Sequence, residues 1–335
     1  MTSATLTSWP ITFDDVVSAR ARLAPHLAAT AFRGYPLLDD AVGAGIRLLV
    51  KHENHQPTCS FKVRNGLSLM TALDAEERRR GVVAASTGNH GQGVAYGAAL
   101  LGVDAIICVP RGNNPEKNAA MRAWGARVIE DGRDYDDALQ AMLRIAQQEG
   151  RTIAHSTNDP RIIAGAGTMT LEMVDQAREG GDGMIDAIVL AIGGGSQAVG
   201  AMPVVRELAP HVQVFGVQAV GAAAQFDSWQ ARERRTTERA DTFAEGVATR
   251  STYDLTFPAL LDGLAGFVTL TDGEIAEGVR LILATTHNLV EGAGAMGVMG
   301  TMKLRDQLRG KRVAVAFCGG NMDSAVLRRI LNQEM

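Results

Sequence analysis

The sequence predicts an α/β protein with open, mostly parallel sheets flanked by helices. Two observations lead to this prediction: short runs of Val, Ile, Ala and Leu recur along the chain, and helical patterns separate them. The apolar runs are continuous rather than alternating, which is typical of strands buried on both faces of a parallel sheet. With 335 residues, of which 46% are apolar, the chain is long enough for one large domain or two ordinary ones.

Seven segments are expected to form strands. In chain order they are residues 47–51, 81–85, 105–109, 152–155, 187–192, 212–217 and 313–317. Clear helical patterns occupy residues 89–101, 135–148, 196–208 and 273–288. The last of these helices begins at a capping box, because Thr271 precedes Glu274 by three residues.

Composition narrows the classes of protein to be considered. The formal net charge of -4 and the mixing of both signs argue against a nucleic-acid-binding protein. No apolar run is long enough to span a membrane, and the N-terminus lacks the basic and apolar stretches of a secretory signal. The cysteines, Cys59, Cys108 and Cys318, have no paired spacing, which argues against a disulfide framework or a zinc site. We therefore expect a cytoplasmic protein with no nucleic-acid, membrane or metal partner.

Three glycine-rich segments follow expected strands, and they would lie at the carboxyl ends of the sheets, where α/β proteins bind ligands. They are residues 86–93, 193–196 and 318–321. Residues 193–196 precede an expected helix, so their bare backbone and the helix N-terminus would suit a phosphate. Residues 86–93 offer hydroxyls and main-chain N–H groups to a carboxylate. For each segment, an ordinary strand-to-helix turn is the alternative.

Residues 193–198 also match a loose Gly-x-Gly-x-x-Ala dinucleotide pattern. A nicotinamide cofactor would need an acidic side chain at the end of the next strand to hold its ribose. The strand expected at 212–217 is instead followed by Gln218, Ala219 and Val220. A simple phosphate is therefore favoured over the cofactor of a nicotinamide-dependent oxidoreductase.

Lys62 lies between Phe61 and a stretch that contains Leu67, Leu69 and Met70. A lysine is ordinarily a solvated surface charge. When burial lowers its pKa, however, its amine can bond covalently to a carbonyl cofactor. Spacing alone leaves both roles open for Lys62.

Together these segments resemble the motifs of fold-type II pyridoxal-phosphate enzymes, and among them the threonine/serine dehydratases and serine racemase. Residues 60–64, Ser-Phe-Lys-Val-Arg, are similar to the family's lysine motif, and the three glycine-rich segments are similar to its carboxylate, phosphate and last strand-end motifs. Further matches are residues 165–168 with Glu172, residues 244–248 and residues 291–295. Residues 51–55 and 286–292 resemble a subgroup that includes hydroxyectoine-utilisation dehydratases.

The resemblance implies two open, mostly parallel sheets in two domains, with pyridoxal 5'-phosphate in the cleft between the domains. The large domain would comprise residues 1–73 and 160–335, and the small domain residues 74–159 inserted in it, with no C-terminal regulatory domain. Closure of the small domain over the substrate would exclude water. Family members are usually homodimers, so a homodimer is expected.

The family's residue roles carry over to matching positions of this chain. Lys62 would bond to the cofactor and then act as the base at the substrate Cα, with Ser60 and Thr87 as further catalytic residues. The cofactor would be held by Phe61, Lys62, Asn89, Gly193, Gly194, Gly195, Ser196, Glu291 and Cys318, and the substrate carboxylate by Ser86, Thr87, Asn89 and His90. No metal ligand is expected, because Gln218, Ala222 and Ala224 stand where metal-dependent members carry oxygen ligands.

The implied activity is dehydration and deamination of a small 3-hydroxy amino acid, such as L-threonine or L-serine, to a 2-oxo acid and ammonia. The alternatives are a dehydratase of another 3-hydroxy amino acid, either 3-hydroxyaspartate or a hydroxyectoine-derived compound, and an amino-acid racemase. A non-catalytic sensor would have no use for Lys62. Cys59 and Asn65 stand where the family commonly has glycine, and a side chain at Cys59 is expected to narrow the substrate pocket.

Overall fold

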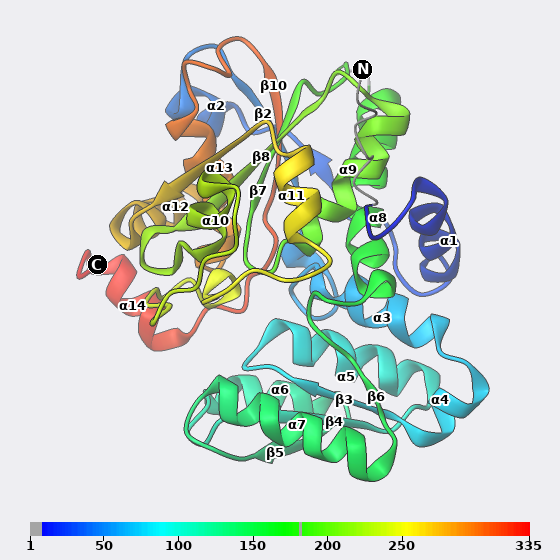
Figure 1. The fold of residues 1–335 in the computed structure, drawn as a ribbon. Helices are drawn as coiled ribbons and strands as arrows, with labels where there is room; N and C mark the ends of the chain where they lie inside the picture. Colours follow the sequence, from blue (N-terminus) through cyan, green and yellow to red (C-terminus); the bar gives the residue numbers. More distant parts are fainter. Residues whose placement is uncertain (1–8, 181–182) are drawn as a thin grey trace.

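The computed structural model describes residues 9–180 and 183–335, which form two separate sheets (Figure 1). In spatial order the six-stranded sheet, in the upper part of Figure 1, contains β1 (Phe32–Arg33), β2 (Arg47–Lys51), β10 (Arg312–Ala316), β7 (Ala187–Ala191), β8 (Gln213–Ala219) and β9 (Gly266–Leu270). The four-stranded sheet, in the lower part, contains β5 (Arg127–Glu130), β4 (Ala105–Val109), β3 (Val82–Ala85) and β6 (Thr152–Ile153). All neighbouring strands are parallel except β1, which pairs antiparallel with β2. The predicted fold class is confirmed.

Helices flank both sheets (Figure 1). Those around the six-stranded sheet are α1 (Phe13–Leu23), α2 (Pro36–Val42), α8 (Pro160–Glu179), α9 (Ser196–Leu208), α10 (Ala224–Ala231), α11 (Phe257–Gly263), α12 (Asp272–Thr286), α13 (Gly292–Lys303) and α14 (Ser324–Leu331). Those beside the four-stranded sheet are α4 (Ala75–Arg80), α5 (Asn89–Leu101), α6 (Pro115–Ala123) and α7 (Tyr135–Glu149). Helix α3 (Lys62–Ala72) packs on both α5 and α8 and so joins the two groups. None of these helices, across residues 9–180 and 183–335, is long and apolar enough to cross a membrane.

Within the part of the chain that the structure describes, three short 3-10 helices occur in the connections. They are η1 (Glu53–His55), η2 (Val220–Ala222) and η3 (Glu245–Val247). The predicted helices are all present, and the capping box between Thr271 and Glu274 forms at the start of α12. Every predicted strand is present as well, although the one expected at residues 152–155 is shortened to Thr152–Ile153.

Strands β1, β5 and β9 were not predicted from the sequence. Each of them lies at an edge of its sheet. Edge strands are only partly covered, and the side chains of these three are largely half-buried or exposed. They therefore lack the continuous apolar runs that marked the central strands.

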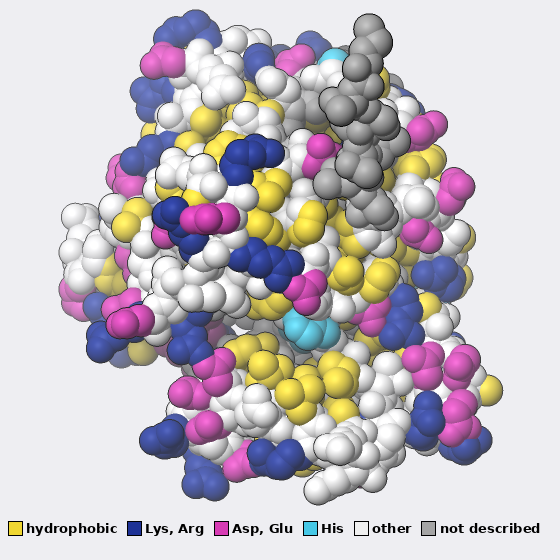
Figure 2. Space-filling model, viewed as in Figure 1, with side chains coloured by type: hydrophobic (Ala, Val, Ile, Leu, Met, Phe, Trp, Pro, Cys, Tyr) yellow, Lys and Arg dark blue, Asp and Glu magenta, His cyan; other side chains and the backbone are white. Residues whose placement is uncertain are grey.

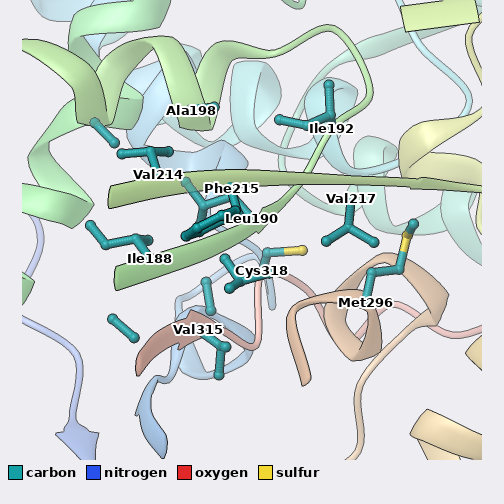
Figure 3. Packing of buried hydrophobic residues seen from close by; sticks show 14 of the residues in the cluster. Ile188, Leu190, Ile192, Ala198, Val214, Phe215, Val217, Met296, Val315 and Cys318 are labelled. Atoms are coloured by element: carbon teal, nitrogen blue, oxygen red, sulfur yellow. The ribbon is translucent and has the colours of Figure 1, made fainter. Parts of the chain in front are cut away.

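The core of the six-stranded sheet lies on both faces of β7, β8 and β10. Figure 3 shows Ile188, Leu190, Phe215 and Val315 packed within it, and all four side chains are buried. Cys318 belongs to the same cluster and lies just after the end of β10 (Figure 3). The packing therefore fixes the position of one predicted site residue.

Helices α3 and α5 are in backbone contact. A Cβ added to Gly66 would lie 2.2 Å from the carbonyl oxygen of Gly93, and one added to Gly93 would lie 2.3 Å from the carbonyl oxygen of Lys62. Only glycine permits so close an approach. The contact brings the start of α3, where Lys62 lies, against the helix that follows β3.

Candidate active site

A cavity of about 960 Å³ lies between the two sheets, and the molecular surface is hollowed between its upper and lower parts (Figure 2). The start of α3 and the turns after β3, β6, β7 and β10 line it. These turns include all three glycine-rich segments. The prediction that they share one edge of the sheets is therefore confirmed.

Lys62 is the first residue of α3 and lines the cavity. Burial lowers its pKa to about 8, although Cys318 and Glu291 act in the opposite direction. Its Nζ donates to the carbonyl oxygen of Ser156 at 3.3 Å and lies 4.9 Å from the centre of the Phe61 ring. Near pH 8, about half of this amine is the free base, which can act as a nucleophile or a proton acceptor.

Residues 193–196 form a turn, here called the cradle, in which the packing leaves no room for side chains at Gly193 and Gly194. A Cβ on Gly193 would lie 2.4 Å from the carbonyl oxygen of Gly246, and one on Gly194 would lie 1.9 Å from Thr157 Oγ1. Gly195 has a φ of +94° and caps the N-terminus of α9. The N–H groups of the first helical turn and the Ser196 hydroxyl suit an anion here, so the residues fit the cofactor's phosphate.

Asn65 lies beside this cradle. Its side chain is fully buried, and its Nδ2 donates to Ser196 Oγ at 3.4 Å. The side chain that replaces the family's usual glycine therefore supports the cradle rather than blocking it.

Asn89 is held between two side chains. Its Nδ2 donates to Glu291 Oε1 at 2.6 Å, and its Oδ1 accepts from Asn321 Nδ2 at 2.7 Å. Burial raises the pKa of Glu291 to about 7, opposed by Lys117 and Asn89. Burial, with a contribution from Glu291, also raises the pKa of Cys318 to about 12, so its thiol is neutral at physiological pH.

The loop after β3 uses two of its backbone donors and one of its side-chain donors within the protein. Ser86 Oγ accepts from the N–H groups of Gly88 and Gly91, at 3.2 and 2.9 Å. His90 Nε2 lies 2.8 Å from the carbonyl oxygen of Ala154, and burial lowers the pKa of His90 to about 3. Because a carbonyl oxygen only accepts, this neutral ring has its proton on Nε2 and no N–H left for a carboxylate. Of the predicted carboxylate contacts, His90 can therefore contribute only its backbone N–H.

Most predicted site residues line the cavity together. They are Phe61, Lys62, Ser86, Thr87, Asn89, His90, Gly193, Gly194, Gly195, Ser196, Glu291 and Cys318. Ser60 does not: its side chain is fully buried outside the cavity wall, and its backbone bridges to Gly319. The catalytic role predicted for Ser60 stays a prediction without geometric support.

The expectation that Cys59 narrows the pocket is wrong. Its side chain is exposed and lies outside the cavity lining. Its φ of 51° is in the left-handed region, where glycine is the least strained residue. The preference for glycine at this position therefore reflects backbone conformation rather than space for a substrate.

Sequence reasoning missed several cavity residues. Lys117 Nζ lies 2.6 Å from Glu245 Oε2, and this ion pair joins α6 to η3 across the cavity. No motif surrounds Lys117, whereas Glu245 lies in the recognised segment at residues 244–248. His155, which follows β6, could have been found, because it ends a predicted strand at the ligand-binding edge.

Within the described ranges, no group of three or more His, Cys, Asp or Glu side chains is arranged to hold a metal ion.

Comparison with known proteins decides the family. The model of the family described as "Pyridoxal-phosphate dependent enzyme" matches residues 23–319. The chain belongs to this family. Its cofactor is therefore pyridoxal phosphate, and the nicotinamide alternative is set aside.

Two curated relatives of this pyridoxal-phosphate dependent enzyme cover nearly the whole chain. It is 35% identical to L-threonine ammonia-lyase of Thermotoga maritima over 323 residues, which is 96% of this chain and 79% of the relative. It is 30% identical to the catabolic L-threonine dehydratase TdcB of Escherichia coli K12 over 326 residues, 96% of each chain.

Solved structures of similar proteins share the fold of the pyridoxal-phosphate dependent enzyme described here. The T.th. threonine deaminase superposes with a TM-score of 0.88 at 34% identity, covering 93% of this chain and 99% of that one. Maize serine racemase superposes with a TM-score of 0.89 at 26% identity, covering 97% and 98%.

Proposed function

We propose that this enzyme dehydrates and deaminates a small 3-hydroxy amino acid, such as L-threonine or L-serine, to a 2-oxo acid and ammonia. The observation that carries the proposal is the cavity-facing amine of Lys62, whose pKa is lowered to about 8 among three glycine-rich turns. The names of the threonine ammonia-lyase and dehydratase relatives support the choice of substrate.

Bound pyridoxal phosphate supplies an aldehyde that bonds to amines and a ring that withdraws electrons from the substrate Cα. Lys62 would hold the cofactor and act as the base that takes the proton from Cα. A pKa of about 8 suits this role, because the amine is then a good proton acceptor and part of it is already neutral near physiological pH. The same amine can return its proton to the departing β-hydroxyl.

The remaining residues would orient the reactants. Residues 193–196 would hold the cofactor phosphate, and the backbone N–H groups after β3 would hold the substrate carboxylate. Cys318, Asn89 and Glu291 would contact the ring. A neutral thiol at Cys318 would add no charge to that ring, so the ring would be a weak electron sink. Elimination tolerates a weak sink, because the β-hydroxyl leaves as charge develops at Cα.

We also propose that residues 74–159 form a domain that moves against the rest of the chain. In support, all strands of the four-stranded sheet lie between residues 82 and 153. The ion pairs Lys117–Glu245 and Asp136–Arg250 link this part to the six-stranded part at the cavity and would favour a closed, water-excluding state. A homodimer and a cytoplasmic location are further proposals, the latter supported by three cysteines that form no disulfide.

Amino-acid racemisation is a second candidate activity. It needs a proton donor on the face of Cα opposite Lys62, and the hydroxyl of Thr87 at the cavity wall could supply it. Formation of D-serine from L-serine, measured beside 2-oxo acid release, separates the two activities. Thr87→Ala should abolish D-serine formation selectively if racemisation occurs.

The test of the main proposal combines the visible spectrum with product assays. Wild type and Lys62→Ala are compared after purification with pyridoxal phosphate, and then L-threonine and L-serine are added. We expect a yellow wild type that releases a 2-oxo acid, and a variant that lacks the lysine-bound chromophore. Cofactor binding without any oxo acid from either substrate would refute the dehydratase assignment.

A further inference from the structure

His155 follows β6 and lines the same cavity as Lys62. Its Nδ1 accepts hydrogen bonds from the backbone N–H groups of Thr157 and Asn158, at 3.1 and 2.9 Å. A ring nitrogen that accepts cannot also carry a proton, so the neutral ring has its proton on Nε2. The loop therefore fixes both the tautomer and the orientation of the imidazole.

The surroundings of His155 keep this ring neutral and in place. Burial lowers its pKa, the nearby Lys62 amine lowers it further, and Asp159 acts in the opposite direction. Its ring meets the edge of the Tyr253 ring, with the centroids 5.7 Å apart. Within the described part of the chain, its Nε2–H has no hydrogen-bond acceptor. The cavity wall thus contains an oriented donor that no group among the described residues uses.

Two features place this donor near the reacting part of a substrate. The carbonyl oxygen of Ser156, the next residue, accepts from Lys62 Nζ at 3.3 Å. Strand β6 also pairs with β3, so His155 and the loop at residues 86–91 leave neighbouring strands at the same edge. Neighbouring strands are about 4.8 Å apart. That spacing is comparable to the separation of the carboxylate and the β-substituent in a small amino acid.

We infer that the Nε2–H of His155 donates a hydrogen bond to the β-hydroxyl of the substrate, making His155 a specificity-determining residue for 3-hydroxy amino acids. The inference deepens the proposed function and rests on it. A hydroxyl oxygen accepts this bond, whereas a methyl group in its place leaves the donor unpaired. The ring of His90 cannot serve in this way, because its N–H is engaged by Ala154.

Equilibrium binding of two unreactive analogues tests the inference independently of turnover. 2-Methylserine and 2-methylalanine both lack a proton on Cα, and they differ only in the β-hydroxyl. Their dissociation constants are measured from the change in the visible spectrum of the holoenzyme. We expect wild type to bind 2-methylserine about fivefold more tightly, as one net hydrogen bond provides.

Two variants separate hydroxyl recognition from support of the loop. In His155→Asn, the amide oxygen can replace Nδ1 as acceptor for the loop, but the Nε2–H donor is lost. In His155→Gln, an amide N–H can reach the Nε2 position, but the loop acceptor is lost. We expect the preference for 2-methylserine to vanish in His155→Asn and to be partly kept in His155→Gln. His26→Gln, outside the cavity lining, should bind both analogues as wild type does.

An unchanged preference in His155→Asn would overturn the inference. A second result would also overturn it: Tyr253→Phe loses the preference for 2-methylserine while His155→Asn keeps it. The phenol hydroxyl of Tyr253 would then be the donor. Failure of the proposed function is distinguishable from these outcomes. It would appear as wild-type enzyme that binds the analogues but releases no 2-oxo acid from L-threonine or L-serine.

Discussion

Arg64 and Glu53 form a two-point ion pair, with Nε and Nη2 of the guanidinium 2.7 and 2.9 Å from the carboxylate oxygens. Arg64 also donates three bonds to Glu172 and Thr168, so all five of its N–H groups are used. Both members of the Arg64–Glu53 pair are at most 1% exposed. Because Arg64 follows Lys62 by two residues, this network anchors the helical turn that carries the reactive amine.

Glu53→Gln should lower the free energy of unfolding by about 3 kcal/mol, because it leaves a buried guanidinium partly uncompensated. Urea denaturation of the apoprotein measures the change. Glu76→Gln is the control, because Glu76 pairs with Arg79 and Arg80 at the surface and its loss should change stability by less than about 0.5 kcal/mol. Equal effects of the two substitutions would contradict a special role for the buried pair.

The same pair predicts a pH dependence of stability. Burial acts to raise the pKa of Glu53, but Arg64, Lys51 and Thr30 together outweigh it, and the pKa is lowered from 4.5. A carboxylate with a lowered folded-state pKa contributes stability above its unfolded pKa and loses it as pH falls through the folded one. The difference between wild type and Glu53→Gln should therefore be constant from pH 6 to 8 and shrink below about pH 4.5. A difference that grows on acidification would contradict this linkage.

Uptake of pyridoxal phosphate by the apoprotein should follow the titration of Lys62. Its pKa of about 8 predicts a rate that rises roughly tenfold per pH unit below 8 and levels off above it, because only the free amine reacts. Stopped-flow absorbance measures the rate, with Nα-acetyllysine as the reference amine. A profile for the protein that keeps rising to pH 10, as the reference should, would show that burial does not shift Lys62.

Gly194→Ala should weaken binding of the cofactor at least tenfold. The added Cβ would lie 1.9 Å from Thr157 Oγ1, so the cradle must move. Absorbance titration of the apoprotein with pyridoxal phosphate measures the affinity. Gly273→Ala is the matched control, because its Cβ would meet only Thr271 Oγ1, at 4.0 Å, in the first turn of α12. Cofactor affinity that is unaltered by Gly194→Ala would remove residues 193–196 from the phosphate site.

Cys59→Gly should raise the free energy of unfolding by about 0.5 kcal/mol. A left-handed conformation costs a non-glycine residue about 1 kcal/mol, and the greater freedom of glycine in the unfolded chain offsets part of that gain. Cys59→Ala keeps the strain and should be nearly neutral, since the side chain is exposed. Denaturation midpoints of the three proteins decide the order, and a Cys59→Gly protein less stable than Cys59→Ala would refute the argument.

Central strands and loop motifs could be predicted from the sequence, because full burial and close backbone approach leave clear patterns. The run at residues 187–191 and the glycines at 193–195 are examples. The edge strands β1, β5 and β9 could not, since partial burial leaves no continuous apolar run. The ring of His90 is close to the expected position, yet its proton is committed to Ala154, a detail that depends on tertiary contacts. The Lys117–Glu245 pair joins segments 128 residues apart and has no local signature.

The place of β10 within its sheet has a consequence for biosynthesis. This strand, near the end of the chain, lies between β2 and β7 at the middle of the six-stranded sheet. During translation the sheet therefore stays split into two unpaired halves until residue 316 has left the ribosome. The four-stranded sheet is complete by residue 153 and can fold first. A nascent chain stalled before β10 should thus carry one folded unit and two exposed strand edges, and these edges would be a substrate for chaperones.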